Sequence, residues 1–500
     1  MAVSWSSNEH VLLTPAEASA ADAWAINSGV SGLDLMESAG RATAEMLVEY
    51  IGTPLETGGE IIVLCGPGNN GGDGFVTARY LDDWGYPVRV IAVSSLDEMT
   101  SDAAEMAEIW RGQTDKIDAA RLKNVSVVVD CLFGTGLSRP IEEPIADLIN
   151  KVNALDAFKL AVDLPSGLDG VTGLPTGACF QADATVTFSY RKPAHLIAPG
   201  RFYCGGADHV HVADIGLPEE SLSELDPQYF SNEPSLWGWC FPFQGPETHK
   251  YDRGHLLVLG GKEPTLGASR LASMAALRAG AGLVTLAAPS ETYGVQAAAL
   301  TDVMVRRFDS VFGFIGIMAD HRIGTVILGP GSGISEKTVD MVQQAGRKER
   351  NMVLDADVLS SMIGRIEIIS DIKNCAVVLT PHEGEFIRLF PDLDYKKDRL
   401  AAVRAAAKRA CATVVLKGVS TVVADETGRV SIATNAPSWL AVGGTGDVLS
   451  GIIGSLLVQG MPAFEAASAA VWMHGEAGMK AGRGMIASDL VNAIPSILPG

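Results

Sequence analysis

Short, mostly apolar runs alternate with longer stretches of helical character along most of this chain, and this alternation limits the fold more than any other feature. In the first half the runs are IIVLC (61–65), VRVIAV (88–93), VSVVVDCLF (125–133), KLAVDL (159–164) and ATVTF (184–188). Apolar strands separated by helices are typical of a parallel sheet that is covered on both faces. We therefore predict a Rossmann-like, three-layer α/β/α domain in residues 1–215.

The alternation stops after this domain and then resumes. Residues 216–245 are rich in Pro and acidic residues and have no sustained periodicity, so they are predicted to connect two domains. Beyond them the apolar runs return as HLLVLGG (255–261), LVTLAA (283–288), TVILGPG (325–331), MVLDAD (352–357), AVVLTP (376–381) and TVVLKG (413–418). Residues 246–500 are therefore predicted to form a second α/β domain.

The distribution of charge favours two separately built units and excludes one class of partner. The formal net charge is −21, with 13 Lys and Arg against 33 Asp and Glu in residues 1–228 and 25 against 26 in residues 229–500. No basic patch is available to neutralise a phosphate backbone, so no nucleic acid is expected as a partner. No apolar run reaches the roughly 20 residues that cross a bilayer, so no membrane is expected either. The seven cysteines form no CxxC pair, which favours reduced thiols in a cytoplasmic protein and no zinc site.

A glycine-rich loop, Gly66-Pro67-Gly68-Asn69-Asn70-Gly71-Gly72-Asp73-Gly74, follows the first apolar run directly and precedes a helix. Glycines in such a loop let backbone N–H groups approach a pyrophosphate at the helix N-terminus. The dinucleotide-binding fingerprint also needs an acidic residue about 20 positions further on. Residues 89–94 contain none, which disfavours an ordinary NAD-linked dehydrogenase. The alternative is a tight turn without a ligand, but Asn-Asn-Gly-Gly-Asp is more polar than a turn requires.

Two further loops place polar residues at the ends of strands. Asp130 is followed by the loop Gly134–Pro140, and Asp163 is followed by Pro165-Ser166-Gly167. Open α/β sheets bind their ligands at this edge. Asp163 is the strongest candidate for a general acid or base, and Asn70, Asp130 and Ser166 supply hard oxygens that suit a group-1 or group-2 cation. The alternative for each aspartate is a cap on the following helix.

The second domain carries a glycine-rich turn of its own, Ala441-Val442-Gly443-Gly444-Thr445-Gly446-Asp447, between a strand and a helix. The N–H groups of such a turn form an anion hole, and Asp447 at its mouth is placed to take a proton from a hydroxyl. Phosphoryl transfer needs such a base and such stabilisation of charge. Lys417, which follows another strand, is a candidate to lie along a nucleotide phosphate. The alternatives are a turn with an aspartate cap and a lysine in a surface turn.

Three segments of the first domain, GPGNNGGDG (66–74), DCLFGTGLSRP (130–140) and AVDLPSGLDG (161–170), together resemble the NAD(P)HX epimerase domain of the bifunctional NAD(P)H-hydrate repair enzymes. The resemblance covers residues 10–215. It implies Asp163 as the catalytic group and a potassium ion held by Asn70, Asp130 and Ser166. The substrate contacts that it implies are Asn69, Asn70, Gly71, Gly72, Asp73, Gly134, Thr135, Gly136, Leu137, Ser138, Arg139, Pro140 and Asp163.

Gly-Thr-Gly-Asp in the second domain resembles the ribokinase-like superfamily. Gly267-Ala268-Ser269, Gly329–Gly333, Asp355-Ala356-Asp357 and Thr380–Glu385 narrow the likeness to the ADP/ATP-dependent NAD(P)H-hydrate dehydratases, over residues 245–498. The resemblance implies a ribokinase-like fold and Mg²⁺. It also implies Asp447 as the catalytic group, hydrate contacts by Ala268, Gly333, His382 and Asp447, and nucleotide contacts by Lys417, Gly418, Val419, Ser420, Thr421 and Gly446. Asn435–Leu440 departs from the more usual Gly-rich form of that segment.

Both resemblances together imply repair of the hydrated cofactors NADHX and NADPHX. The first domain would interconvert their R and S epimers, and the second would use ADP or ATP to remove water from the S epimer. A homo-oligomer is expected from the domain class. Two alternatives stay open at this point: a kinase for a vitamin precursor or a sugar, and a dinucleotide-binding regulatory module without turnover.

Overall fold

The computed structural model describes residues 10–99, 101–137 and 139–499, which divide into two compact units. The first is Val11–Tyr229, and the second begins at Phe230 and includes His10. Each unit is an α/β domain built on a mainly parallel sheet, so the predicted class is confirmed. The division falls inside the segment 216–245 that was predicted as a connector.

The sheet of the first unit is parallel throughout its seven described strands, which lie in the order β4-β3-β2-β5-β6-β7-β8. The five predicted apolar runs are β2, β3, β5, β6 and β7. The strands are β2 (Glu60–Cys65), β3 (Val88–Ala92), β4 (Thr114–Lys116), β5 (Val125–Cys131), β6 (Phe158–Val162), β7 (Ala184–Phe188) and β8 (Val210–Ala213).

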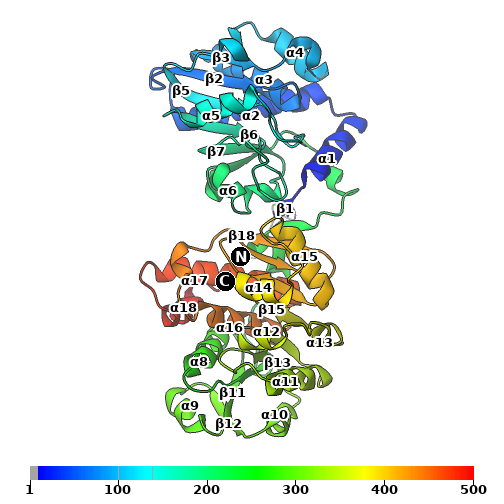
Figure 1. The fold of residues 1–500 in the computed structure, drawn as a ribbon, viewed down its shortest axis with the longest axis vertical. Coiled ribbons are helices and arrows are strands. Elements are labelled where there is room, and N and C mark those ends of the chain that lie inside the picture. Colours follow the sequence, from blue (N-terminus) through cyan, green and yellow to red (C-terminus); the bar gives the residue numbers. More distant parts are fainter. Residues whose placement is uncertain (1–9, 100, 138, 500) are drawn as a thin grey trace. The chain divides into compact units, whose positions relative to one another are not determined.

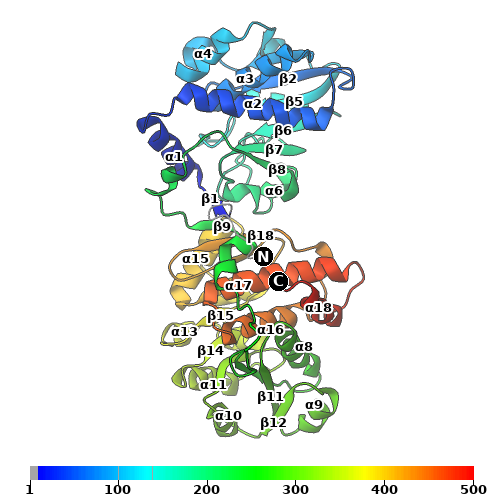
Figure 2. The same cartoon turned by 180° about the vertical axis from the view of Figure 1, so that it is seen from behind.

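Helices cover both faces of this sheet, because alternate residues of each strand point to opposite sides. Ile61 and Val63 of β2 pack with α2, α3 and α4, whereas Ile62 and Leu64 pack with α5. α5 lies in front of the sheet in Figure 1, and α2 lies in front in the reverse view of Figure 2. The helices are α1 (Pro15–Asn27), α2 (Gly32–Ile51), α3 (Asn69–Asp83), α4 (Ser101–Ile109), α5 (Ile145–Asn153) and α6 (Gly200–Tyr203).

The sheet of the second unit runs in the order β9-β18-β17-β16-β15-β14-β13-β10-β11-β12. It is parallel from β16 to β12, and the hairpin β17–β18 adds an antiparallel edge. The six predicted runs are β10, β11 and β13–β16. The strands are β9 (Tyr229–Ser231), β10 (His255–Leu259), β11 (Leu283–Pro289), β12 (Met304–Phe308), β13 (Ile323–Leu328), β14 (Asn351–Leu354), β15 (Val377–Leu379), β16 (Thr413–Leu416), β17 (Thr421–Ala424) and β18 (Val430–Ala433).

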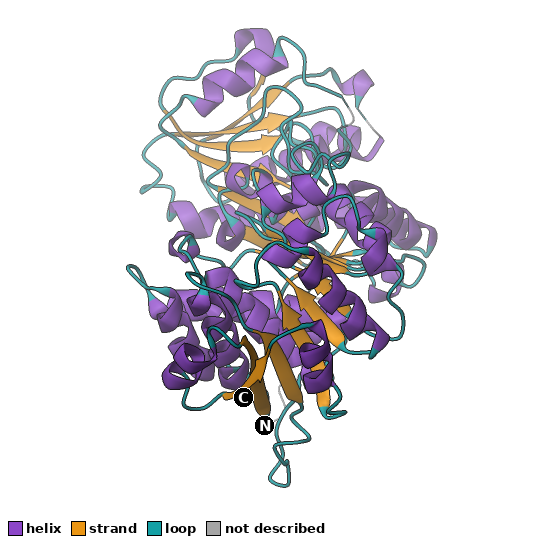
Figure 3. Cartoon of the chain, turned by 60° about the horizontal axis from the view of Figure 1, so that its bottom comes forward, coloured by secondary structure: helices purple, strands orange, loops and turns teal. Residues whose placement is uncertain are grey.

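Helices also cover both faces of the second sheet, as the colouring in Figure 3 shows. Helices α8, α16, α17 and α18 share one apolar core with the strands, and α11 packs on β13 and β14. The helices are α7 (Pro234–Trp237), α8 (Leu266–Arg278), α9 (Tyr293–Ala299), α10 (Val311–Met318), α11 (Glu336–Arg347), α12 (Asp357–Ser361), α13 (Glu367–Ser370), α14 (Glu383–Leu389), α15 (Arg399–Ala410), α16 (Thr445–Val458), α17 (Ala463–Ala481) and α18 (Ala487–Ala493). None of the helices in the described ranges is long and apolar enough to cross a bilayer.

The predicted connector is not a free linker. Its second part contains β9 and α7, and Trp237 is fully buried in the core of the second unit. The indole of Trp237 lies 5.6 Å from that of Trp472, centroid to centroid, and its Nε1 donates to Asn232 Oδ1 (3.3 Å). The segment lacks periodicity because Pro and Gly separate its few apolar residues. The buried indole of Trp237 nevertheless fixes it on the domain.

Candidate active sites

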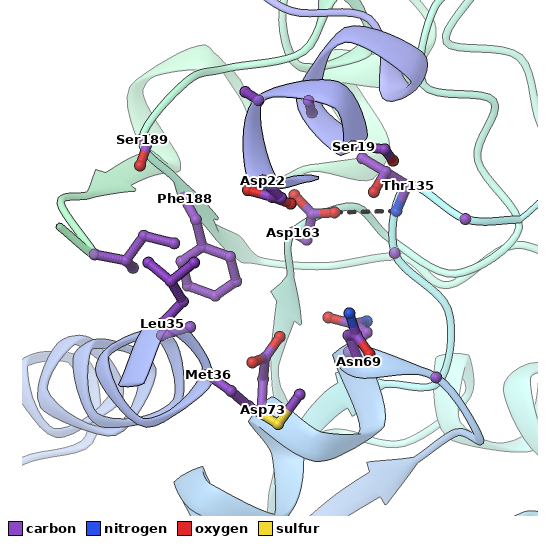
Figure 4. Close-up of a pocket in the computed structure, with 18 of the residues that line it drawn as sticks. Ser19, Asp22, Leu35, Met36, Asn69, Asp73, Thr135, Asp163, Phe188 and Ser189 are labelled. Atoms are coloured by element: carbon purple, nitrogen blue, oxygen red, sulfur yellow. Dashed lines mark hydrogen bonds between the residues drawn. The ribbon is translucent and has the colours of Figure 1, made fainter. Parts of the chain in front are cut away.

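A cavity of about 570 Å³ lies in the first unit, where the loops after β2, β5, β6 and β7 meet α1, α2 and α3 (Figure 4). The cavity therefore lies at the edge of the sheet where the strand-end rule places a ligand. The predicted contact residues among its lining are Asn69, Asn70, Asp73, Gly134, Thr135, Gly136, Leu137, Arg139 and Asp163. Gly71, Gly72 and Pro140 do not line it, and Ser138 lies outside the described residues.

Two glycines of the first loop are required by close packing. A Cβ on Gly71 would lie 1.9 Å from the carbonyl oxygen of Gly66, and a Cβ on Gly72 would lie 2.4 Å from Met36 Sδ. Neither position has room for a side chain, so these residues let the start of α3 approach the loop and α2. Neither residue lines the cavity, and the substrate contact predicted for both stays a prediction.

Asp163 follows β6 with its carboxyl group held in a fixed orientation. Oδ1 accepts hydrogen bonds from Lys192 Nζ (2.5 Å) and Thr187 Oγ1 (3.2 Å), and Oδ2 accepts one from the backbone N–H of Thr135 (3.0 Å; Figure 4). The residue has φ 67°, in the left-handed region that a non-glycine residue seldom adopts. Such conformations are frequent at active sites, where the surrounding structure must hold them.

Asp163 is ionised in this environment. Burial by itself would raise its pKa, but Lys192 and the hydrogen bonds outweigh burial and hold the pKa below its ordinary value. His195 also holds Asp163 in place. Its Nδ1 accepts a hydrogen bond from the backbone N–H of Lys192 (2.9 Å), so the ring proton is on Nε2. This Nε2–H donates to the carbonyl oxygen of Asp163 (2.8 Å). Burial, with Lys192 adding to it, lowers the pKa of His195 to about 3, and the imidazole is neutral.

Two more carboxyl groups line the same cavity. Asp73 of α3 is 8% exposed, and Asp22 of α1 is open to the cavity. Burial raises the pKa of Asp73 well above its ordinary value, and the charges on Asp163 and Asp22 add to this rise. Of Asp22, Asp73 and Asp163, the ion pairs found among the described residues give a cationic partner to Asp163 alone, which favours the carboxylate at Asp163 and the protonated form at Asp73.

Asp130 and Ser166, two of the predicted cation ligands, lie in direct contact. Ser166 donates from its N–H to Asp130 Oδ2 (2.8 Å) and from its Oγ to Asp130 Oδ1 (2.7 Å). The Asp130 carboxyl group is fully buried, and in the described part of the chain no Lys or Arg pairs with it. Burial raises its pKa to about 6. The third predicted ligand, Asn70, reaches Val162 O (3.3 Å) and Gly134 N (3.2 Å) with its amide.

The second unit gathers charged groups at the start of α16. Lys417 Nζ lies 3.0 Å from Asp355 Oδ1, and a Cβ on Gly446 would lie 3.3 Å from the same nitrogen. Ser450 Oγ donates to the other oxygen of Asp355 (2.7 Å). Burial raises the pKa of Asp447 to about 7, with the charge on Asp355 adding to the rise and Lys417 opposing it. The ammonium group of Lys417 and the carboxyl group of Asp447, whose pKa is close to neutral pH, therefore lie at the N-terminus of α16.

A buried guanidinium fixes the loop that begins at Lys417. Arg399 donates to the carbonyl oxygens of Leu416 (3.4 Å) and Lys417 (3.1 Å) and pairs with Glu383 Oε1 (2.7 Å). The backbone N–H of Lys417 donates to Pro381 O (2.9 Å). The predicted nucleotide loop is thus attached to the segment that carries His382.

His382 has a structural task that the sequence did not indicate. It is the N-cap of α14: its Nδ1 accepts from the N–H groups of Gly384 (3.0 Å) and Glu385 (3.3 Å). The imidazole remains exposed on its other side. Gly333, another predicted hydrate contact, donates from its N–H to Asp357 Oδ2 (2.8 Å). Ala268 lies in the first turn of α8, whose Leu271 approaches Gly444 at the start of α16.

Comparisons with known proteins agree with this arrangement over both domains. Residues 32–194 match a family model described as YjeF-related protein N-terminus, and residues 256–499 match one described as NAD(P)H-hydrate dehydratase. The bifunctional NAD(P)H-hydrate repair enzyme of Salinibacter ruber is 34% identical over 97% of this chain and 96% of its own length. The chain belongs to this repair-enzyme family. The Escherichia coli enzyme of the same name is 36% identical over 87% of this chain and 84% of its own length.

The family that the sequence predicts is therefore confirmed, as is the prediction that the chain is an enzyme. Among solved structures, the ADP/ATP-dependent NAD(P)H-hydrate dehydratase of Bacillus subtilis, co-crystallised with ATP/Mg²⁺, is 26% identical and covers 51% of this chain and 92% of its own, with a TM-score of 0.46. A ribokinase-like superfamily protein of Enterococcus faecalis is 22% identical and covers 54% of this chain and 94% of its own, with a TM-score of 0.47.

Sequence reasoning missed the residues that hold Asp163 in place in this repair-enzyme chain. Lys192, Thr187 and His195 all lie in or just after β7, and each contacts Asp163. One signal was present: Lys192 follows an apolar run, and β7 pairs with β6 in the sheet. Applying the strand-end rule to this fifth run would have placed Lys192 at the same edge. Asp22, on the first helix, had no such signal.

Proposed function

We propose that the first domain, residues 11–229, interconverts the R and S epimers of NADHX and NADPHX, and that the second removes water from the S epimer with ADP or ATP as phosphoryl donor. The observation that carries this proposal is the likeness to bifunctional relatives over nearly the whole chain, with a candidate site in each domain. One domain would supply the other with the epimer that it can use.

In the first domain, Asp163 would act as the general base. Its carboxylate is ionised, oriented by three donors and directed into a cavity whose size is ordinary for a small-molecule site, roughly 300–1,000 Å³. The loops at Asn69–Asp73 and Gly134–Pro140 would hold the nucleotide part of the substrate. Lys192 would keep Asp163 ionised and could offer its remaining protons to a substrate oxygen.

In the second domain, Asp447 would take the proton of the substrate hydroxyl while the phosphoryl group is transferred to that oxygen. N–H groups in the first turn of α16 and the Lys417 ammonium would stabilise the charge that develops on the phosphoryl oxygens. Phosphate then leaves with the electrons of the C–O bond, and loss of a proton from the adjacent ring carbon restores the double bond. The products are NADH or NADPH, inorganic phosphate, and AMP from ADP or ADP from ATP.

The adenine nucleotide would lie along Lys417, Gly418, Val419, Ser420 and Thr421, with Gly446 beside it. Arg399 holds the start of this loop through two carbonyl oxygens. Mg²⁺ at nucleotide sites is usually held by one or two carboxylates together with the phosphates, so it would arrive with the nucleotide. Asp355, Asp357 and Asp447 are the carboxylates close enough to influence one another there.

We expect potassium to bind at Asn70, Asp130 and Ser166, because a fully buried carboxylate with only N–H and O–H partners suits a weakly charged cation. The ion would neutralise Asp130 and fix the loop after β5. The melting temperature of the first domain should therefore rise with KCl and not with tetramethylammonium chloride at equal ionic strength. Asp130→Asn should remove this increment, and a wild-type melting temperature indifferent to the cation would contradict the site.

The direct test of the proposed function uses a mixed-epimer preparation of each hydrate, with Mg²⁺ and either ADP or ATP. Full return of the reduced-nicotinamide absorbance is expected with one donor or both. Recovery that stops at the share of one epimer would leave the dehydratase and remove the epimerase. No recovery with either nucleotide would favour the kinase alternative, which a screen of small hydroxylated precursors would then examine.

The location and assembly of the protein are also part of this proposal. The cysteines of the described chain are all free, which agrees with a reducing compartment, and we place the enzyme in the cytoplasm. The homo-oligomer expected from the domain class stays a prediction.

A further inference from the structure

Asp73 is a carboxyl group of the first domain's cavity that the proposed mechanism does not use. It lies in the second turn of α3, is 92% buried, and points in Figure 4 into the space below Asp163, between Met36 and Asn69. Apart from the hydrogen bonds of the α3 backbone, its carbonyl oxygen accepts from Thr77 Oγ1 (2.7 Å), and within the described residues its carboxyl oxygens have no hydrogen-bond partner. Because Asp73 lines the cavity, its carboxyl group is available to a ligand there.

The surroundings of Asp73 favour its protonated form. Burial has the largest effect on its pKa, and the negative charges of Asp163 and Asp22 act in the same direction. The Cys65 thiol also stays neutral, because burial raises the thiol pKa. The ammonium group of Lys192, which lines the same cavity, is paired with Asp163.

Asp102 of α4 and Arg139 also line the cavity. Cys131, next to Cys65 across the sheet, is a buried thiol whose pKa is likewise raised by burial. Two carboxyl groups thus face one cavity in opposite states, Asp73 as an acid and Asp163 as a carboxylate.

We infer that Asp73 is the general acid of epimerisation, acting on the substrate hydroxyl from α3 while Asp163 acts as the base from the end of β6; this inference rests on the proposed epimerase function. Water adds to an enamine at the carbon bonded to nitrogen, so the hydroxyl of the hydrate is on the ring carbon next to the ring nitrogen. Such a hydroxyl leaves readily once it is protonated, because the nitrogen lone pair stabilises the cation.

The step balances as loss and return of one water molecule. The Asp73 proton moves to the hydroxyl oxygen, the C–O bond breaks with its electrons on oxygen, and the nitrogen lone pair forms a C=N bond. A water molecule then attacks the same carbon from the other face, the C=N electrons return to nitrogen, and the water gives its proton to Asp163. Solvent carries a proton back from Asp163 to Asp73, and the reverse reaction uses the two carboxyl groups with their roles exchanged.

Oxygen exchange tests this route in the wild-type protein. A single epimer is incubated with the enzyme in H₂¹⁸O without nucleotide, and the opposite epimer is analysed by mass spectrometry at low conversion. One ¹⁸O atom per inverted molecule is expected. Inverted product that retains its original ¹⁶O would overturn the inference, because inversion would then proceed without breaking the C–O bond, for example by ring opening at nitrogen.

Asp73→Asn tests the residue. The amide keeps the shape of the side chain but has no acidic proton, so the rate of inversion should fall by about a hundredfold or more, with dehydration of the S epimer unchanged. Asp83→Asn is the matched control, since it makes the same change at an exposed position of the same helix.

The outcomes separate the inference from the function on which it rests. Inversion by Asp73→Asn within a few-fold of the wild-type rate would overturn the inference and leave the epimerase standing. Absence of inversion by the wild-type protein would remove the proposed function itself. If Asp73→Asn does not fold, the ¹⁸O measurement on the wild type still decides between the two routes.

Discussion

Asp447→Asn is expected to reduce nucleotide-dependent dehydration by about a hundredfold or more, because the amide cannot accept the proton of the substrate hydroxyl. Asn retains the size of the side chain and the hydrogen-bonding capacity of one oxygen at the start of α16. The KM for the nucleotide should therefore change less than kcat. Epimerisation, which takes place in the other domain, should continue at the wild-type rate.

The same residue gives dehydration its pH dependence. Because Asp447 must be ionised to act as a base and burial raises its pKa to about 7, the wild-type kcat should rise between about pH 6 and pH 8 and then level off. The effect on stability has the opposite sign. A carboxyl group whose pKa is raised in the folded state binds more protons there than in the unfolded state, so its ionisation destabilises the fold as pH rises towards 7.

Asp447→Asn should accordingly melt no lower than the wild type at pH 8, and the difference between them should shrink at pH 5. Asp371→Asn, at an exposed position of the same domain, is the matched control for rate and stability. A wild-type kcat that falls between pH 6 and pH 8, or an Asp447→Asn variant that keeps its rate, would contradict the assignment of the base.

The strands that the sequence revealed are the central ones. Their residues are buried on both faces, so the pattern is a plain apolar run that needs no knowledge of the partner strand. The edge strands β12 and β4 were missed because they lack such a run: β12, with the sequence MVRRF, is exposed at three of its five residues, and β4, with TDK, carries almost no apolar surface. β17 and β18 are only four residues each and form an antiparallel hairpin, outside the alternation of strands and helices that the prediction followed.

The strand-end rule predicts those site residues that directly follow an apolar run. It does not predict contacts that depend on which strands are neighbours in the sheet. Asp130 and Asp163 end consecutive apolar runs, so topology alone brings their loops together. Lys192 looked like an ordinary charged residue after a strand, and only the adjacency of β6 and β7 reveals it as the partner of Asp163. Local contacts explain the remaining differences. The sequence does not show that α2 leaves Gly72 no room for a side chain, or that His382 uses one ring nitrogen to cap α14.

Substitutions at Asp163 can separate an effect on catalysis from an effect on stability, because its ion pair with Lys192 can be removed as a whole. Asp163→Asn should lower the rate of epimerisation by about a hundredfold or more and leave dehydration of the S epimer intact. Asn is a suitable replacement since it tolerates the left-handed backbone at φ 67°. The substitution does leave Lys192 buried without its counter-charge, which typically costs about 3–5 kcal/mol of folding stability.

A second change tests whether the lost activity is merely lost stability. Asp163→Asn combined with Lys192→Met removes both charges, so the unpaired ammonium group disappears and the free energy of unfolding of the first domain should return most of the way to the wild-type value. Epimerisation should stay as low as in the single variant, because no carboxylate faces the cavity from β6. If the double variant recovers activity along with stability, Asp163 is a structural partner of Lys192 and the base must be sought among the other carboxyl groups of the cavity.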